Sequence, residues 1–405
     1  MSLVDIKVEL GLDLTGGLGR FVLDNDAFGV LGTSQLDALV FYDVTSFVKS
    51  LSTNRGRSRQ LDHFNAGTAV VNFDNRGREF DPLNTDSVYY PGIRPRNFLK
   101  ITCKDYPVFY GFVNDWDLKY GIDGNDSAVA SCSDAFMVLS NQVLSEFTPS
   151  AQLSGARVNA VLDRSEVDFI GGRDISVGSS NLGAYAVDAG TNVLSYLRQV
   201  EKSEQGSLFV DAVGDIIFRG RTDPPESATI LFADDGSGIP YQTLMNEYGD
   251  ELLFNYIKFT SPAGVEQVQS DLVSISKYQI SQLSDDRLLN SSTGIVNFLA
   301  SASLNKFKEP RVRLTGFQVQ MQGLDETHQN DVLSIELAGY IDLKRSFNVG
   351  LPSSLTQFSF VSGVSHNVSP DSHTVLFTIE ASEGTLYLLL GDAVAGKLDF
   401  GALDI

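Results

Sequence analysis

Cysteine, histidine and tryptophan are scarce in this 405-residue chain, and each scarcity excludes a class of protein. The chain has two cysteines, four histidines and one tryptophan. Two cysteines cannot form the dense disulfide framework of a small secreted domain, so Cys103 and Cys132 are expected to be buried free thiols. No apolar run approaches the roughly 18 residues of a membrane-spanning helix, and the first residues lack the pattern of a signal peptide. No membrane insertion is predicted.

Basic residues are also few relative to acidic ones. The chain carries 51 acidic and 30 basic residues, a formal net charge of −21. A protein that grips nucleic acid through its phosphates needs a basic surface, so this function is disfavoured. The acidity either serves solubility alone or forms a surface that repels DNA.

One block of the chain, residues 51–100, has more basic than acidic side chains. Its arginines are either ordinary solvated residues or a contact surface for an acidic neighbouring subunit. The residues predicted to make that subunit contact are Arg55, Arg57, Arg59, Arg76 and Arg78.

Motifs for catalysis and for metal binding are absent as well. No histidine pair has metal-ligand spacing, and there is no Gly-x-Ser-x-Gly, P-loop or dinucleotide fingerprint. His366 and His373 flank an expected turn, where a hydrogen-bonded surface role outweighs a metal site. Residues 24–26 resemble the start of a calcium loop, but Gln35 stands where the bidentate Glu is needed, so a turn is expected. The sequence predicts no enzyme, no cofactor and no metal, although its many carboxylates leave a sugar-cleaving pair open.

Alternation of polar and apolar residues dominates what is present. Residues 68–73 alternate strictly, which predicts a strand with one buried face, and Asn75 and Gly77 allow the chain to turn after it. The arginines at 55, 57 and 59 precede this strand in a segment expected to be an edge or a loop. Further strands are expected at 6–10, 20–23, 39–42, 98–103, 110–113, 116–120, 129–132, 208–210, 216–219, 265–270, 317–321, 331–339, 358–364 and 374–381.

Helical spacing of apolar residues is confined to short segments. Residues 134–147 have apolar side chains at helical spacing, and Pro149 ends the pattern. Residues 191–205 form a second amphipathic segment that Gly206 stops. Further helices are expected at 156–162 and at 293–307.

Residues 57–84, RSRQLDHFNAGTAVVNFDNRGREFDPLN, carry a family resemblance. Together with PGIRP at 91–95 and VFYGFVNDWDLKY at 108–120, this stretch resembles the N-terminal part of the tail hub proteins of long-tailed bacteriophages, often called minor tail proteins. The helix and hairpin at 191–219 are a second point of similarity. Such hubs resemble the central hub of contractile-tail baseplates and the base of type VI secretion spikes.

The resemblance implies a mainly β fold with a minor α part (α+β), made of two β-barrel-like domains and a mixed α/β module. The implied divisions are an N-terminal barrel-like hub domain at 1–125, the mixed module at 126–225, strands and a helix inserted at 226–309, a second barrel-like domain at 310–382, and an extended or partner-bound tail at 383–405.

The function that the resemblance implies is structural. A homotrimeric hub would join the tail tube to the distal tip of the virion after assembly in the host cytoplasm. Its partners would be distal tail or tube proteins, the tape-measure protein and tip or receptor-binding proteins, with DNA only in transit through the channel. The alternatives are a receptor-binding or carbohydrate-binding adhesin, a distal tail ring protein and a cell-wall hydrolase.

Overall fold

The structure, a computed structural model, describes residues 5–14, 40–169, 171–223, 230–262, 264 and 266–382. The expected strand at 20–23, the turn at 24–26 and the tail at 383–405 lie outside the described residues.

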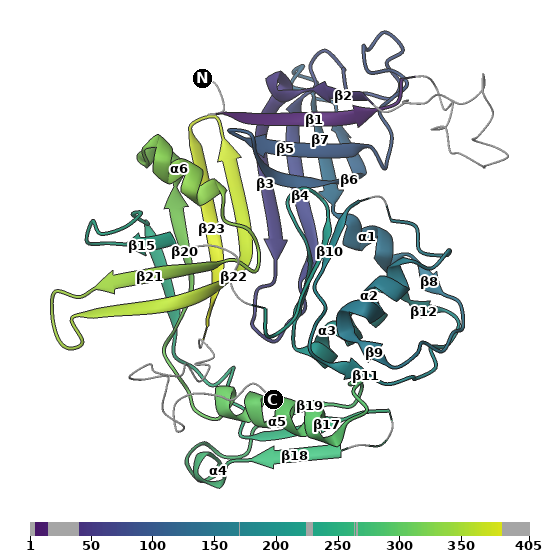
Figure 1. Cartoon of the computed structure of the whole chain (residues 1–405). Helices are drawn as coiled ribbons and strands as arrows, with labels where there is room; N and C mark the ends of the chain where they lie inside the picture. Colours follow the sequence, from purple (N-terminus) through teal and green to yellow (C-terminus); the bar gives the residue numbers. More distant parts are fainter. Residues whose placement is uncertain are drawn as a thin grey trace.

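Alternating polar and apolar residues build one 13-stranded sheet that joins both ends of the described chain (Figure 1). Residues 68–73 lie in its fourth strand, as their alternation predicts. The strands are β1 (Ile6–Leu12), β2 (Val40–Asp43), β3 (Val48–Gly56), β4 (Asn65–Asp74), β5 (Phe98–Cys103), β6 (Tyr106–Lys119), β7 (Ser127–Ser133), β15 (Ile230–Ala233), β16 (Thr243–Glu247), β20 (Arg313–Gln320), β21 (Tyr340–Ser346), β22 (Ser354–Ser369) and β23 (Ser372–Ala381).

The strand order explains how the two ends of the chain become one sheet. It runs β16-β20-β23-β22-β3-β4-β7-β6-β5-β1-β2, with β21 paired to β22 and β15 paired to β21. The join is the antiparallel pair of β3 with β22, from Gly56 opposite Gly363 to Leu51 opposite Val368. The mainly β character with a minor helical part is confirmed. No closed barrel is present among the described residues, because the strands expected to form two barrels make one continuous sheet instead.

Gly56 permits the close approach of β3 and β22. Its φ is +114°, and a Cβ atom there would lie 2.2 Å from the carbonyl oxygen of Ser362. The next residue, Arg57, donates its backbone N–H to that same oxygen at 2.8 Å. Only glycine combines this backbone conformation with so close a contact.

The mixed module packs beside β4 and β6, on the right of Figure 1. Its longest helix begins after Asn192, whose side chain caps Ser195 N, and ends at Gln205 in the left-handed conformation. The elements are α1 (Ala135–Ser140), β8 (Val143–Leu144), β9 (Gln152–Leu153), α2 (Ser154–Leu162), β10 (Arg173–Ile175), β11 (Asn181–Leu182), β12 (Thr191–Asn192), α3 (Val193–Glu204), β13 (Ser207–Val210) and β14 (Ile216–Arg219).

A smaller unit, at the bottom of Figure 1, has a separate hydrophobic core. Helix α5 covers a three-stranded sheet of order β18-β17-β19, and Ile257, Val296 and Leu299 are fully buried between them. The elements of this lower unit are β17 (Tyr256–Thr260), β18 (Glu266–Ser270), α4 (Leu272–Tyr278), β19 (Gln282–Asp285) and α5 (Thr293–Phe307).

Several sequence predictions need correction. The expected helix at 134–147 ends at Ser140, because Val143 and Leu144 pair with β12 instead. The expected strand at 331–339 is wrong: α6 (Glu326–Leu333) occupies its start, and β21 begins only at Tyr340. The segment with Arg55 is not an edge or loop, because β3 lies between β22 and β4.

Candidate functional site

One face of the long sheet is open to solvent and is the broadest surface feature of the described chain; we call it the outer face. Residues opposite one another in register point to the same face, so a single row can be followed from strand to strand. The row runs through Gln320, Thr374, Asn367, Ser52, Val70, Ser131 and Asp115, all at least partly exposed.

Over the central strands the side chains on the outer face are small and mostly uncharged, whereas Phe98 and Phe112 on β5 and β6 place aromatic rings there. A parallel row holds Ser50, Asn72, Val129 and Asp117. Hydrogen bonds tie neighbouring strands across the face: Asn72 Nδ2 donates to Ser50 Oγ at 2.9 Å, and Ser365 Oγ donates to Asn54 Oδ1 at 2.9 Å. Most side chains on the opposite side are buried and apolar, with Arg55, His366 and His373 as buried exceptions. The alternation in the sequence is that of a sheet with one face exposed to solvent.

Charge on the outer face is concentrated at one end. Asp115, Asp117 and Lys119 are exposed on β6, and Asp74 lies beside them at the end of β4. The central strands β22, β3 and β4 contribute serine, threonine, asparagine and valine. The face is therefore neutral over its central strands, while Lys100 on β5 and Lys7 on β1 add further charges beyond β6.

Behind this face an ion pair between a buried arginine and a partly exposed glutamate connects the two halves of the sheet. Arg55 on β3 is only 4% exposed, and its Nη1 lies 2.6 Å from Glu336 Oε1. Glu336 Oε2 also accepts the backbone N–H of Ala212, in the β13–β14 turn, at 3.0 Å. One carboxylate thus joins the N-terminal strands, the mixed module and the segment before β21.

Asp134, the N-cap of α1, lies next to this ion pair and is as buried as Arg55. Asp134 accepts the backbone N–H groups of Phe136, at 2.9 Å, and Gly67. Burial raises the pKa of the Asp134 carboxyl to about 7, although these donors and nearby Arg55 act in the opposite direction. Asp134 is therefore the N-cap of α1, and its bond to Gly67 also fixes the start of β4.

Arg57 makes the second bond between the halves. Its guanidinium binds Glu380 on β23 in a bidentate manner, with Nε–Oε1 and Nη2–Oε2 distances of 2.7 and 2.9 Å. The same group lies 4.8 Å from the ring centroid of Phe64. Planar pairing and stacking of this kind suit arginine and would be lost with lysine.

The five arginines predicted to contact a subunit therefore differ in their surroundings. Arg55 and Arg57 are paired inside the chain. Arg59, Arg76 and Arg78 have side chains that are 67%, 64% and 47% exposed, with partners at Glu251, Asp74 and Asp81 respectively. For these three exposed residues, a subunit contact stays a prediction.

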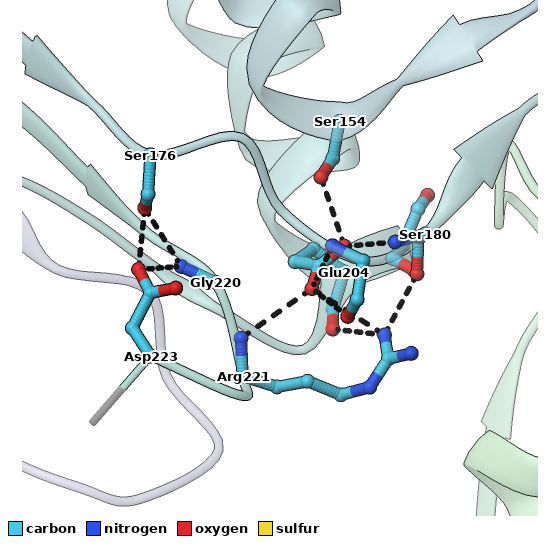
Figure 2. A network of polar contacts seen from close by, with 9 residues as sticks. Ser154, Ser176, Ser180, Glu204, Gly220, Arg221 and Asp223 are labelled. Atoms are coloured by element: carbon cyan, nitrogen blue, oxygen red, sulfur yellow. Dashed lines mark hydrogen bonds and ion pairs between the residues drawn. The ribbon is translucent and has the colours of Figure 1, made fainter. Parts of the chain in front are cut away.

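A fully buried carboxylate organises the end of the mixed module (Figure 2). Glu204 accepts hydrogen bonds from Ser154 Oγ at 2.8 Å, Ser180 N at 2.7 Å and Ser179 Oγ at 2.8 Å, and Arg221 Nη1 lies 3.4 Å away. Burial alone raises the pKa of Glu204, but these donors and the Arg221 charge outweigh it and hold the pKa below its usual value. The network fixes the loops on both sides of α3, and every oxygen of Glu204 is already engaged.

The histidines were predicted to lie at a surface turn, and this was wrong. β22 continues through His366 to Ser369, so the turn falls later, and both rings point into the core at 5% and 3% exposure. His366 Nδ1 lies 3.0 Å from His373 Nε2. Both cysteines are buried and free, as expected.

The described residues contain no group of three or more His, Cys, Asp or Glu side chains arranged to hold a metal ion. In the same part of the chain, no helix is long and apolar enough to cross a membrane. A cleft of ≈ 570 Å³ opens between β1 and α6, but Asp5, Lys7, Lys104 and Glu326 give it both signs of charge, which favours no ligand class.

Comparison with known proteins finds similarity only at the level of structure. No family model and no curated protein matches the chain. A 43 kDa tail protein of prophage MuSo2 from Shewanella oneidensis superposes with a TM-score of 0.57 at 9% identity, covering 92% of this chain and 98% of the other. A tail protein from Neisseria meningitidis superposes with a TM-score of 0.56 at 11% identity, covering 84% and 97%.

The chain has the fold of phage tail proteins. A third tail protein, gp18 from a Listeria monocytogenes prophage, has a TM-score of 0.50 at 10% identity and covers 92% of this chain. The resemblance to tail proteins that was based on residues 57–84 is thus confirmed at the level of the fold. What sequence reasoning missed is the outer face as a unit, because its rows join strands from opposite ends of the chain.

Proposed function

We propose that this chain is a structural component of a phage tail tip, a hub ring that joins the tail tube to the distal tip. The observation that carries the proposal is the shared fold over nearly the full length of both chains in the Shewanella and Neisseria comparisons. The absence of a catalytic motif in the sequence is compatible with a structural role and adds no separate support.

In this proposal the outer face lines the channel. A row of serine, threonine and asparagine offers no cluster of cations to hold DNA and no broad apolar patch to hold a protein in transit. In this proposal the expected acidic wall is reduced to Asp115, Asp117 and Asp74 at one end, where Lys119 also lies, and the central strands of the channel wall are neutral. Weak interaction with the passing tape-measure protein and DNA follows from this neutrality.

Three copies of the chain form the ring in this proposal. Each copy would present two related surfaces, one from the strands up to β7 and one from the sheet strands from β15 onward. A trimer would then present six such surfaces, matching a sixfold tube on one side and a threefold tip on the other. Arg59, Arg76 and Arg78 are the proposed contacts to acidic neighbouring surfaces, because their side chains are exposed. Tube, distal tail and receptor-binding proteins of the virion would be the partners.

The proposal is tested by locating the chain in intact virions. A gold-labelled tag on the chain is expected to mark the tail axis at the distal end of the tube. Labels on peripheral fibres would replace the hub with the adhesin alternative, and binding of the purified chain to host glycans would support that alternative. Six copies in a ring would instead indicate a distal tail ring protein.

A further inference from the structure

His366 and His373 are two buried titratable side chains that bond to each other. They lie on the paired strands β22 and β23, and the distance from His366 Nδ1 to His373 Nε2 is 3.0 Å. One ring must donate in this hydrogen bond and the other must accept. The bond therefore exists when neither ring, or only one, carries an extra proton, and it is lost when both do.

On the β3 side the histidine pair meets a cation. His366 lies opposite Thr53 in the β3–β22 pair, and Arg55 is two residues further along β3. Burial, the neighbouring ring and the Arg55 charge all lower the pKa of His366. The nearby carboxylates, Glu336 and Asp134, lie beside Arg55, and among the described residues neither ring has an acidic partner of its own. A proton on the pair therefore meets like charge.

On its other side the pair borders a small cavity that α6 helps to close. The cavity has a volume of ≈ 10 Å³, which is room for about one water molecule. His373 forms one part of its wall, and Gln329 and Leu333 of α6 form another. The remaining lining residues are Cys103 and Lys104 at the β5–β6 turn and Met321 and Gln322 after β20. Lys104 is the one charged residue of the lining, and it lies 3.9 Å from Asp5.

Helix α6 is held less firmly than the strands that carry the histidines. Of its eight residues only Val332 and Leu333 are buried. The hydrogen bonds from Gln329 Nε2, to the backbone oxygens of Met321 and Leu324, tie it to the turn directly before it. By contrast, β22 is paired with β23 on one side and with β3 on the other. The opening that costs least therefore moves α6 and leaves these strands paired.

We propose that α6 is an acid-sensitive lid over the histidine pair, and that protonation of the two rings displaces α6 while β3, β22 and β23 stay paired. Once hydrated, each ring regains an ordinary pKa near 6.5, so the open form binds protons that the closed form excludes. In the closed form, burial lowers the pKa of His373 to about 4. Between these two pH values the ratio of open to closed chains rises as pH falls, by up to about tenfold per pH unit for each ring.

The other histidine of this region acts in the opposite direction. His328 Nδ1 lies 3.0 Å from Asp325 Oδ2 at the start of α6. A proton on His328 adds an attraction to that carboxylate, so it holds the start of the helix more firmly and does not open the lid. The displacement is a property of the single chain and does not depend on the hub proposal.

Cys103 reports the opening without any substitution. It lines the cavity and is 2% exposed, so displacement of α6 uncovers its thiol. The matched control is Cys132, which is 3% exposed on β7, between β4 and β6. In the closed chain burial raises the pKa of both thiols, which keeps them unreactive.

The measurement is the rate of labelling by a dipyridyl disulfide between pH 7 and pH 5. Each rate is divided by that of the same cysteine in the urea-unfolded chain at the same pH, which corrects for thiolate content. The relative rate of Cys103 is expected to rise by at least about tenfold, and that of Cys132 to stay constant. The rise should be smaller in His373→Gln, which takes up no proton at this position.

Two results would overturn the proposal. Equal rises at Cys103 and Cys132 would show that the sheet opens as a whole, and no rise at Cys103 would show that α6 stays closed in acid. Deuterium uptake gives a second readout on the parent chain, which keeps the test valid if His373→Gln does not fold. After correction for intrinsic exchange, amides of residues 328–333 should lose about tenfold of their protection from pH 7 to pH 5 while those of β22 keep theirs. Loss in β22 before α6 would contradict the lid.

Discussion

Arg55 and Glu336 show how one ion pair connects distant parts of the chain. The arginine is almost fully buried and lies on the central strand β3, whereas Glu336 precedes β21 and also accepts a backbone hydrogen bond from the mixed module. Sequence reasoning identified the arginines of this stretch as distinctive but could not find the partners of Arg55 and Arg57, which lie 281 and 323 positions away. Their pairing inside the chain is a consequence of the strand order.

Loss of the Glu336 charge should destabilise the protein. In Glu336→Gln the buried guanidinium of Arg55 loses the carboxylate that its Nη1 contacts, and only Asp134 remains nearby, so the free energy of unfolding in urea should fall by about 2 kcal/mol. The control is Glu251→Gln, which breaks the pair with Arg59, where both side chains are more than half exposed. That control should change stability by less than about 0.5 kcal/mol. Equal effects of the two variants would contradict the account.

His366 and His373 should make the protein sensitive to acid. Burial lowers the pKa of His373 to about 4 and holds the pKa of His366 well below its usual value, and nearby Arg55 lowers the latter further. Between pH 6.5 and pH 4 these two histidines bind more protons in the unfolded chain than in the folded chain, so their contribution to stability falls as pH falls through this window.

The variant His373→Gln isolates that effect. The slope of unfolding free energy against pH between 6.5 and 4 should be shallower than in the parent by up to about 1.4 kcal/mol per pH unit. Urea titrations at several pH values measure the slope and separate it from any constant loss of packing. Parallel slopes in the two proteins would show that His373 does not titrate on unfolding.

At the scale of elements, the periodicity of apolar residues predicted correctly those helices and strands whose structure depends on their own residues. Helix α5 spans Thr293–Phe307, α3 fills the expected 191–205 segment, and the β13–β14 hairpin turns where Gly214 allows. Prediction failed where a distant partner decides: Val143 joins a strand pair with β12, and His366 stays in strand because β3 lies alongside it. Local patterns carry no information on such partners.

Gly56 is a position where an added side chain is expected to disrupt the pairing of two strands. In Gly56→Ala the new methyl group would overlap the Ser362 carbonyl oxygen, so the β3–β22 pair must separate. We expect the free energy of unfolding to fall by about 3 kcal/mol or more, measured by urea or thermal denaturation.

Gly124→Ala is the matched control for Gly56→Ala. It also has positive φ, +78°, but nothing lies within 4 Å of the added carbon. It should lose only about 1 kcal/mol from backbone strain. If both variants lost the same amount, the close approach of β3 to β22 would not matter for stability.

At the scale of the whole molecule, the chain combines one continuous sheet, a mixed module and a lower unit in the fold of phage tail proteins. The sequence predicted the mainly β class and the tail-protein resemblance. It could not predict that the strands form one sheet, because this depends on the pairing of β22 with β3 from opposite ends of the chain. It could not predict which side chains share the outer face either, because the register of that pair decides it. The five-part division of the chain stays a prediction.

The most direct test of the central proposal is a reconstruction of the tail tip by electron cryomicroscopy at side-chain resolution. The account predicts three copies around the tail axis at the distal end of the tube, with Ser52, Val70 and Asn367 facing the channel. Copies away from the axis, or a ring whose channel is lined by another surface of the chain, would contradict it.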